Sequence, residues 1–193
     1  MCARKEALRR LLRSRRAAIN DAERLVAERA VCDALLESLA DLNLEQGYVG
    51  LYAAMGSELK LDQLAVACGE RGYRIAYPAV LSETEMGFYS SEPPVFGELR
   101  TTVLFSHPGR VMAPEQLASL VPVFPEHIRV LVVPAIAYDR EGYRLGQGGG
   151  YYDRYIREIA AHAVTWGAGF AAQMLDSVPR ECHDARLERV FVA

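Results

Sequence analysis

The ten residues from Arg144 to Asp153 bring together a glycine-rich loop, two adjacent tyrosines and an acid. Glycine tolerates positive φ and has no Cβ, so a loop of glycines can turn successive backbone N–H groups toward one anion. A helix that follows such a loop adds its unpaired N–H groups and the positive end of its dipole. Because phosphate is often held in this way, the run is predicted to be a nucleotide phosphate site.

The segments on either side of the loop agree with that prediction. His127 to Pro134 is apolar enough for a buried strand, and Tyr151 to Ala161 has helical character. The spacing matches neither the Walker A pattern, which needs a Lys and a Ser or Thr after its last glycine, nor the dinucleotide fingerprint G-x-G-x-x-G. A tight turn before a helix also explains the glycines, with Asp153 as an ordinary first-turn acid. The glycines alone therefore leave both interpretations open.

The longer string around the loop resembles the signature of one family. Pro134 to Asp139 (PAIAYD) precedes the loop and Tyr151 to Arg154 (YYDR) follows the glycines, and the whole is similar to the signature of the 5-formyltetrahydrofolate cyclo-ligases, also called methenyltetrahydrofolate synthetases. The resemblance extends over nearly the full chain. Its further blocks are Lys5 to Arg9 (KEALR), Tyr52 to Glu58 (YAAMGSE), Val178-Pro179 and His183-Asp184.

The resemblance implies an ATP-dependent reaction that requires Mg²⁺, in which 5-formyltetrahydrofolate is closed to 5,10-methenyltetrahydrofolate with release of ADP and phosphate. In the family mechanism the formyl oxygen attacks the γ-phosphate, and a neighbouring folate nitrogen then displaces the phosphorylated oxygen. Both nucleophiles belong to the substrate, so the protein is expected mainly to position groups and to neutralise charge. The sequence fits this expectation, since it has no Ser-His-Asp order and no nucleophile elbow.

Lys5 and Arg9 are four residues apart, so on a helix they project from one face. Alone, such a pair is interpreted as a solvated basic face, but the family places phosphate contacts at both matching positions. The resemblance therefore implies that Lys5, Arg9 and Arg144 are the catalytic cations. The implied ATP-binding residues are Lys5, Arg9, Arg144, Leu145, Gly146, Gln147, Gly148, Gly149, Gly150, Tyr151 and Tyr152.

Two acids match the family's metal-binding positions. Asp153 and Asp184 are the implied Mg²⁺ ligands, and one or two carboxylates plus phosphate oxygens is the coordination that Mg²⁺ prefers. For Asp184 an ordinary loop carboxylate is the alternative, because its matching block is short.

The folate contacts are implied by a separate block. Glu58 matches a glutamate that contacts the folate, and a carboxylate can accept paired N–H bonds from a pterin edge. Met55 would form an adaptable apolar wall beside it. Adjacent helical residues point about 100° apart, so one of Tyr151 and Tyr152 is expected to face the ligand and the other the core. The family match favours Tyr151 for the folate.

The chain departs from the family pattern in two places. Several relatives carry a basic residue where this chain has Gln147 or Gly149, which puts more weight on the three cations named above. Relatives often have a Glu-Pro pair where this chain has Ala113-Pro114. The missing glutamate leaves substrate affinity and specificity open.

Composition limits the class of protein. A chain of 193 residues and 21.4 kDa fits one domain over residues 1–193. A net charge of −3 is not that of a nucleic-acid binder, and apolar runs such as Val130 to Ala137 are far shorter than the ~20 residues that span a bilayer. No signal peptide is recognisable, although the Arg-rich start would also suit a transit peptide. We expect a cytoplasmic monomer with reduced thiols at Cys2, Cys32, Cys68 and Cys182.

Strands alternate with helices along the chain, which predicts an α/β fold. We expect a single-domain, mostly parallel open sheet with helices on both faces, a Rossmann-like three-layer arrangement whose ligands lie at the carboxyl ends of strands. Helices are predicted at 3–16, from Asn20 with a capping box to Glu23, and at 61–71, 114–120 and 151–161. Strands are predicted at 48–53, 73–77, 86–89, 101–105, 127–134, 164–170 and 187–192. The second helix is expected to pack on the sheet through one apolar stripe, formed by Leu25, Cys32, Leu35, Leu36 and Leu39.

Two other functions fit parts of the sequence. A non-catalytic folate- or nucleotide-binding relative of the same fold would explain Gln147 and Ala113. A sugar-phosphate isomerase-like or CoA-transferase-like enzyme would use a loop carboxylate as base or nucleophile, and Glu58 is the candidate. Dependence on ATP separates both from the cyclo-ligase.

Overall fold

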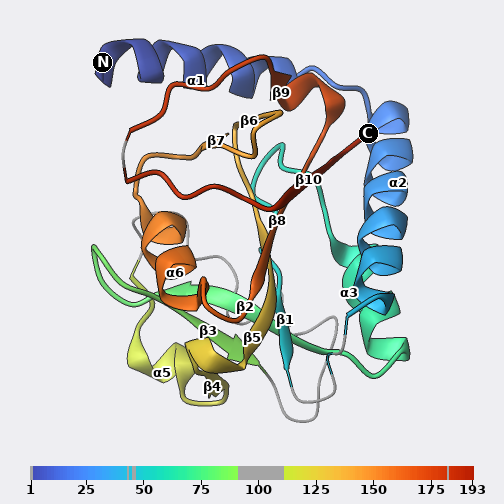
Figure 1. Cartoon of the computed structure of the whole chain (residues 1–193), viewed down its shortest axis with the longest axis vertical. Helices are drawn as coiled ribbons and strands as arrows, with labels where there is room; N and C mark the ends of the chain where they lie inside the picture. The colour runs from blue at the N-terminus through green and yellow to red at the C-terminus, as the bar shows by residue number, and fades with distance from the viewer. Residues whose placement is uncertain (1, 43, 45–46, 91–110, 182) are drawn as a thin grey trace.

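The centre of the fold is a sheet buried on both faces. The structure, a computed structural model, describes residues 2–42, 44, 47–90, 111–181 and 183–193. Within these residues, seven strands form one sheet in the order β10-β8-β5-β1-β2-β3-β4 (Figure 1). Their bounds are β1 Tyr48–Gly50, β2 Arg74–Val80, β3 Met86–Ser90, β4 Val121–Val123, β5 Ile128–Val133, β8 Val164–Gly169 and β10 Arg189–Val192.

The pairing of the strands confirms the predicted open, mostly parallel sheet. The strands from β10 to β2 pair in parallel, whereas β3 and β4 add an antiparallel edge. The sequence does not predict β4, because a three-residue strand with Pro122 in its middle has no recognisable pattern. The strand predicted at 101–105 lies outside the described residues.

β5 shows why the sheet needs helices on both sides. Val130 and Val132 belong to the hydrophobic cluster on one face, and Leu131 and Val133 to the cluster on the other. All four are fully or almost fully buried. A strand buried on both faces requires such a continuous apolar run, which is why the sequence predicts it well.

Helices cover the two faces as predicted (Figure 1). α2 (Asp21–Ala40) and α3 (Asp62–Glu70) lie on one face. α6 (Tyr151–Ile159) lies on the other, where Ile156 and Ile159 join the cluster of Leu131 and Val133. α5 (Pro114–Leu117) is shorter than the predicted 114–120. The 3₁₀ helices are η1 Pro125–His127 and η2 Ala171–Gln173.

α2 begins as predicted but buries a shorter stripe. The Asn20 side chain accepts a hydrogen bond from the Glu23 N–H (2.9 Å), so Asn20 is the N-cap. The expected burial of Cys32, Leu35, Leu36 and Leu39 is confirmed, but that of Leu25 is wrong, because its side chain is 58% exposed. The cluster reaches as far as Ala27, and Arg24 packs over the Phe170 ring, so the buried face runs through these two residues and Leu25 lies at its edge.

A second, small sheet separates the main sheet from the glycine loop. It has the order β7-β6-β9, with β6 Ala137–Asp139, β7 Arg144–Leu145 and β9 Met174–Leu175. α1 (Cys2–Ala17) packs on it through Leu12, which clusters with Ala137 and Leu145. The glycine loop therefore follows β7, and the central strand predicted at His127 to Pro134 lies before this hairpin in the chain. Strands of two or three residues carry no periodic signal from which this hairpin could be predicted.

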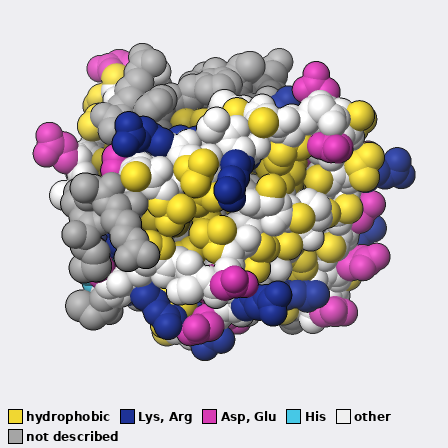
Figure 2. Space-filling view, turned by 90° about the horizontal axis from the view of Figure 1, so that it is seen from above, with side chains coloured by type: hydrophobic (Ala, Val, Ile, Leu, Met, Phe, Trp, Pro, Cys, Tyr) yellow, Lys and Arg dark blue, Asp and Glu magenta, His cyan; other side chains and the backbone are white. Residues whose placement is uncertain are grey.

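The surface is mixed in character. In the view from above, hydrophobic side chains gather across the middle of the face and charged side chains of both signs lie around them (Figure 2). Among the described residues, no helix combines the length and the hydropathy needed to cross a membrane. Two of the cysteines, Cys32 and Cys68, are buried free thiols, and burial raises the pKa of Cys32 to about 11. Cys182 and the side chain of Cys2 lie outside the described residues.

The double burial of β5 can be tested with a core truncation. Leu131→Ala should lower the free energy of unfolding by about 2–5 kcal/mol, because it removes a fully buried side chain from a packed interior. Val66→Ala, at a position 49% exposed on α3, is the control and should change it by no more than about 0.5 kcal/mol. Urea unfolding followed by circular dichroism measures both. Equal effects of the two changes would contradict the assignment of β5 as the centre of the core.

Candidate active site

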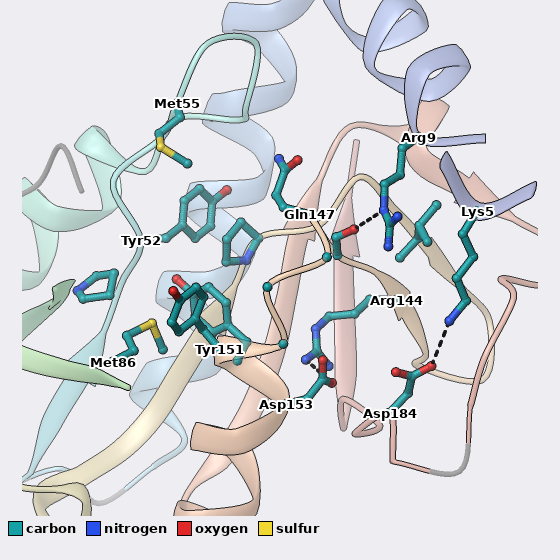
Figure 3. Close-up of a pocket in the computed structure, with 18 of the residues that line it drawn as sticks. Lys5, Arg9, Tyr52, Met55, Met86, Arg144, Gln147, Tyr151, Asp153 and Asp184 are labelled. Atoms are coloured by element: carbon teal, nitrogen blue, oxygen red, sulfur yellow. Dashed lines mark hydrogen bonds and ion pairs between the residues drawn. The ribbon is translucent and has the colours of Figure 1, made fainter. Parts of the chain in front are cut away.

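A pocket of about 370 Å³ lies where β1 and β5 end. Tyr52 and Ala53 follow β1, Pro134 follows β5, and the glycine loop and α1 complete the walls (Figure 3). This is the position at which ligands bind in open α/β sheets. All of the residues predicted from the sequence line this pocket: Lys5, Arg9, Met55, Glu58, Arg144, Leu145, Gly146, Gln147, Gly148, Gly149, Gly150, Tyr151, Tyr152, Asp153 and Asp184.

The sequence prediction missed part of the wall. Five of the missed residues lie within the blocks that carry the family resemblance, so their neighbours in the chain could have indicated them: Tyr52, Ala53, Pro134, Pro179 and His183. Pro78, Val80 and Met86 come from β2 and β3. These strands reach the pocket because they follow β1 in the order of the sheet, which the sequence alone does not give. The remaining wall residue that was not predicted is Glu181.

The glycine loop has the backbone expected of an anion cradle. Gly148 (φ +110°) and Gly150 (φ +66°) adopt left-handed conformations that residues with a Cβ rarely adopt. Gly150 is also the N-cap of α6, and no side chain caps this helix. The first N–H groups of α6 are therefore available to an anion in the pocket.

α1 contributes two cations to the pocket, as predicted. The Arg9 Nε donates to the Gly146 carbonyl oxygen (3.0 Å), which ties the helix to the glycine loop. The Lys5 Nζ donates to Glu181 Oε1 (3.0 Å) and lies 3.8 Å from Asp184 Oδ2. Lys5 and Arg9 thus face the same pocket from one side of α1 (Figure 3).

Arg144 reaches the pocket already paired. Its Nη2 donates to Asp153 Oδ1 (2.6 Å), and its Nη1 donates to the Ala185 carbonyl oxygen (2.8 Å). The Ala185 N–H donates in turn to Asp153 Oδ1 (3.1 Å). The side chains of Arg144 and Asp153 are 4% and 22% exposed, so the pair is well fixed.

The acids of the pocket do not form a metal centre by themselves. Among the described residues there is no group of three or more His, Cys, Asp or Glu side chains that could hold a metal ion. One oxygen of Asp153 is bound to Arg144, and Asp184 Oδ2 accepts the Glu181 N–H (2.7 Å). Because Mg²⁺ bound with a nucleotide takes only one or two protein carboxylates, these two acids fit an ion that arrives with phosphate oxygens.

Glu58 is a buried carboxylate of the pocket wall. It is 3% exposed, and its Oε2 accepts the Met55 N–H (3.0 Å). Its Oε1 accepts a hydrogen bond from Gln147 Nε2 (3.3 Å). Burial raises the pKa of Glu58, while the Met55 N–H and the charge of Arg16 act in the opposite direction.

The adjacent side chains of Tyr151 and Tyr152 contact different parts of the protein. The Tyr151 hydroxyl donates to the Ser82 carbonyl oxygen (3.2 Å), and the guanidinium of Arg154 lies over its ring at 5.1 Å. Tyr152 packs against the core cluster on the α6 face, and burial raises its pKa. Both tyrosines line the pocket, and Tyr152 in addition packs against the core, so the assignment of Tyr151 to the ligand stays a prediction.

The sheet and its pocket define a class, that of open-sheet α/β proteins with a ligand site where the parallel strands end. The chain belongs to the 5-formyltetrahydrofolate cyclo-ligase family, whose sequence description matches residues 1–193.

Individual relatives agree with this membership. A 5-formyltetrahydrofolate cyclo-ligase of Mycolicibacterium smegmatis is 42% identical over 62 residues, which are 32% of this chain and 32% of the relative. One of Escherichia coli is 40% identical over 63 residues, 32% of this chain and 34% of the relative. The chain thus matches only about a third of the length of these relatives.

Two solved structures share the fold. A 5,10-methenyltetrahydrofolate synthetase from Mycoplasma pneumoniae has a TM-score of 0.76 at 22% identity, with 97% of each chain covered. One from Aquifex aeolicus has a TM-score of 0.70 at 25% identity, covering 97% of this chain and 89% of that one.

The raised pKa of Glu58 makes a prediction about stability. Because its pKa is higher in the folded chain than in the unfolded chain, the stability that Glu58 contributes is complete at low pH and is lost as pH rises through the folded pKa. The wild type should therefore lose stability relative to Glu58→Gln as pH increases from about 4. Urea unfolding of both proteins over a pH series measures the difference. A difference that is constant with pH, or that grows in favour of the wild type, would contradict it.

Proposed function

We propose that this protein is an ATP-dependent 5-formyltetrahydrofolate cyclo-ligase that forms 5,10-methenyltetrahydrofolate, ADP and phosphate. The observation that carries the proposal is that one pocket joins a cationic glycine cradle to an apolar wall and is also lined by a buried carboxylate, Glu58. Family membership supports the same reaction. We further propose that residues 1–193 act as one domain, as a cytoplasmic monomer that engages small molecules and not nucleic acid or membrane.

The triphosphate of ATP is proposed to occupy the glycine side. The backbone N–H groups of residues 146–150 and the open first turn of α6 would bind its oxygens. Lys5 and Arg9 would neutralise its charge from α1. Arg144, fixed by Asp153 and the Ala185 carbonyl, would offer its charge without having to be ordered during binding.

The folate is proposed to occupy the apolar side. Tyr151, Met55 and Met86 line this part of the pocket and can contact a flat pterin on its faces. Glu58 would accept N–H groups from the pterin edge, as a buried carboxylate with two lone-pair-bearing oxygens can do. Its burial makes that contact stronger than in water.

The chemistry proposed needs no protein nucleophile. The formyl oxygen attacks the γ-phosphorus, its new O–P bond forms as the bond to ADP breaks, and the neighbouring folate nitrogen then attacks the activated carbon and expels phosphate. The protein aligns the formyl group with the γ-phosphate and excludes water. Mg²⁺, when bound, neutralises charge on the transferring phosphoryl group. Asp153 and Asp184 are the carboxylates proposed to hold it.

The phosphate role of α1 can be tested by kinetics. The double variant Lys5→Ala with Arg9→Ala should raise the KM for ATP by about a hundredfold, because each lost charged hydrogen bond is worth about tenfold in affinity. The KM for 5-formyltetrahydrofolate should change far less. Formation of methenyl product, followed by absorbance, measures both constants.

The matched control is Arg10→Ala, an exposed arginine of the same helix that makes no hydrogen bond or ion pair with the described residues. It should leave both constants unchanged. Equal rises in the two constants for the double variant would argue against a phosphate contact. A wild-type protein that forms no methenyl product with ATP and Mg²⁺ would refute the proposed function itself.

Asp153 is tested with a variant that keeps its shape. Asp153→Ala would leave the buried Arg144 without its partner, so Asp153→Asn is preferable because the amide oxygen can still accept from Arg144. This variant should need at least about tenfold more Mg²⁺ for half-maximal turnover, since it loses a charged ligand. Asp176→Asn, at an exposed carboxylate, is the control. An unchanged Mg²⁺ titration of Asp153→Asn would rule out a metal contact.

A further inference from the structure

One side chain projects from the glycine loop between residues 146 and 150, that of Gln147. Figure 3 places it between Tyr52 and Met55 on one side and Arg9 on the other. Gln147 thus stands where the charged and apolar parts of the pocket meet.

Arg13 fixes that carboxamide from α1. Its Nη2 and Nε both donate to Gln147 Oε1, at 2.6 and 3.2 Å. On the other end of the amide, Gln147 Nε2 donates to Glu58 Oε1 at 3.3 Å. An arginine can only donate and a carboxylate can only accept, so the two partners together allow one orientation of the amide.

The result is a continuous hydrogen-bonded row from a cation, through an amide, to a buried carboxylate. Glu58 is held at its second oxygen by the Met55 N–H (3.0 Å), so Gln147 fixes the remaining oxygen. Without Arg13 the amide could rotate, and the buried Glu58 would lose one of its two hydrogen-bond donors.

Arg13 lies outside the pocket wall and continues the row of cations on α1. Lys5, Arg9 and Arg13 follow one another at intervals of four residues, so they share one face of the helix. Lys5 and Arg9 line the pocket, whereas Arg13 does not. Its side chain is 39% exposed, and its second contact is a 3.8 Å ion pair with the exposed Glu6. Arg13 is therefore not part of the core, and its contact with the pocket wall is the one with Gln147.

We propose that Arg13 is a positioning residue for the folate: through Gln147 it holds the Glu58 carboxylate in the place and orientation that receive the pterin N–H groups. The inference rests on the proposed function. It extends that function by making folate affinity, and not nucleotide affinity, depend on a residue of α1 that touches neither ligand.

The first test measures folate binding directly. Calorimetric titration of 5-formyltetrahydrofolate without nucleotide should give a Kd about tenfold higher for Arg13→Ala than for the wild type. The variant loses the charge-assisted hydrogen bond that holds the Gln147 amide, and with it the orientation of Glu58. Arg13→Lys, which can still donate to Gln147, should recover most of the affinity. Arg10→Ala is the matched control and should equal the wild type. In turnover, the KM for ATP of Arg13→Ala should change less than threefold.

A second variant separates positioning from simple attachment of α1 to the loop. Gln147→Glu keeps an acceptor for Arg13, and even strengthens that contact, but it cannot donate to Glu58 and places two carboxylates together. If Arg13 merely ties the helix to the loop, folate affinity should be unchanged. If the orientation of the amide matters, the Kd for folate should rise at least tenfold while the urea midpoint of the variant stays within the range of the Arg10→Ala control.

The outcomes are distinguishable from those of the proposed function. Arg13→Ala with an unchanged folate Kd, or with equal losses for folate and ATP, overturns the inference while leaving an active wild type as a cyclo-ligase. A wild type that binds folate without forming product refutes the proposed function, and the calorimetric series still decides the role of Arg13. A wild type that does not bind folate overturns both.

Discussion

The pocket depends on how the chain leaves the end of β5. The Tyr138 hydroxyl lies within hydrogen-bond distance of the carbonyl oxygens of Val133 (2.8 Å), the last residue of β5, and Ala168 (2.9 Å), the last but one of β8. Asp139, also buried, accepts N–H groups from its own hairpin turn and from the segment after β9. These contacts fix the β6–β7 hairpin to the sheet, and the hairpin in turn presents Arg144 and the glycine loop.

The cations of the pocket are held in place by acids before any anion arrives. Lys5 pairs with Glu181 and Arg144 with Asp153, at side-chain exposures of 12% and 35% for the first pair and 4% and 22% for the second. The more exposed pair can exchange its acid for a phosphate at little cost, since pairs in contact with water are weak. The buried pair is expected to stay intact, so Arg144 acts as a fixed source of charge.

The sequence was most informative where function constrains consecutive residues. The run from Arg144 to Asp153 predicted the loop, the helix after it and their place in one pocket, because an anion cradle needs those residue types in that order. It could not indicate Met86, which reaches the pocket only through the pairing of β2 with β3. Arg13 carried a usable signal, the four-residue spacing from Arg9. The burial of Leu25 was mispredicted because helical periodicity identifies a face but not its exact edges, and the core meets this end of α2 through Ala27 while Leu25 stays exposed.

The backbone of the glycine loop also limits how this pocket can diversify. Positions 148 and 150 hold conformations that disfavour any other amino acid, so mutation can hardly add a functional group there. Gln147 is under no such steric rule, and its partner on α1 is partly exposed to solvent. A change of ligand preference would therefore be expected at Gln147 and Arg13 together. These two positions lie on separate elements, the glycine loop and α1, and would have to change as a pair.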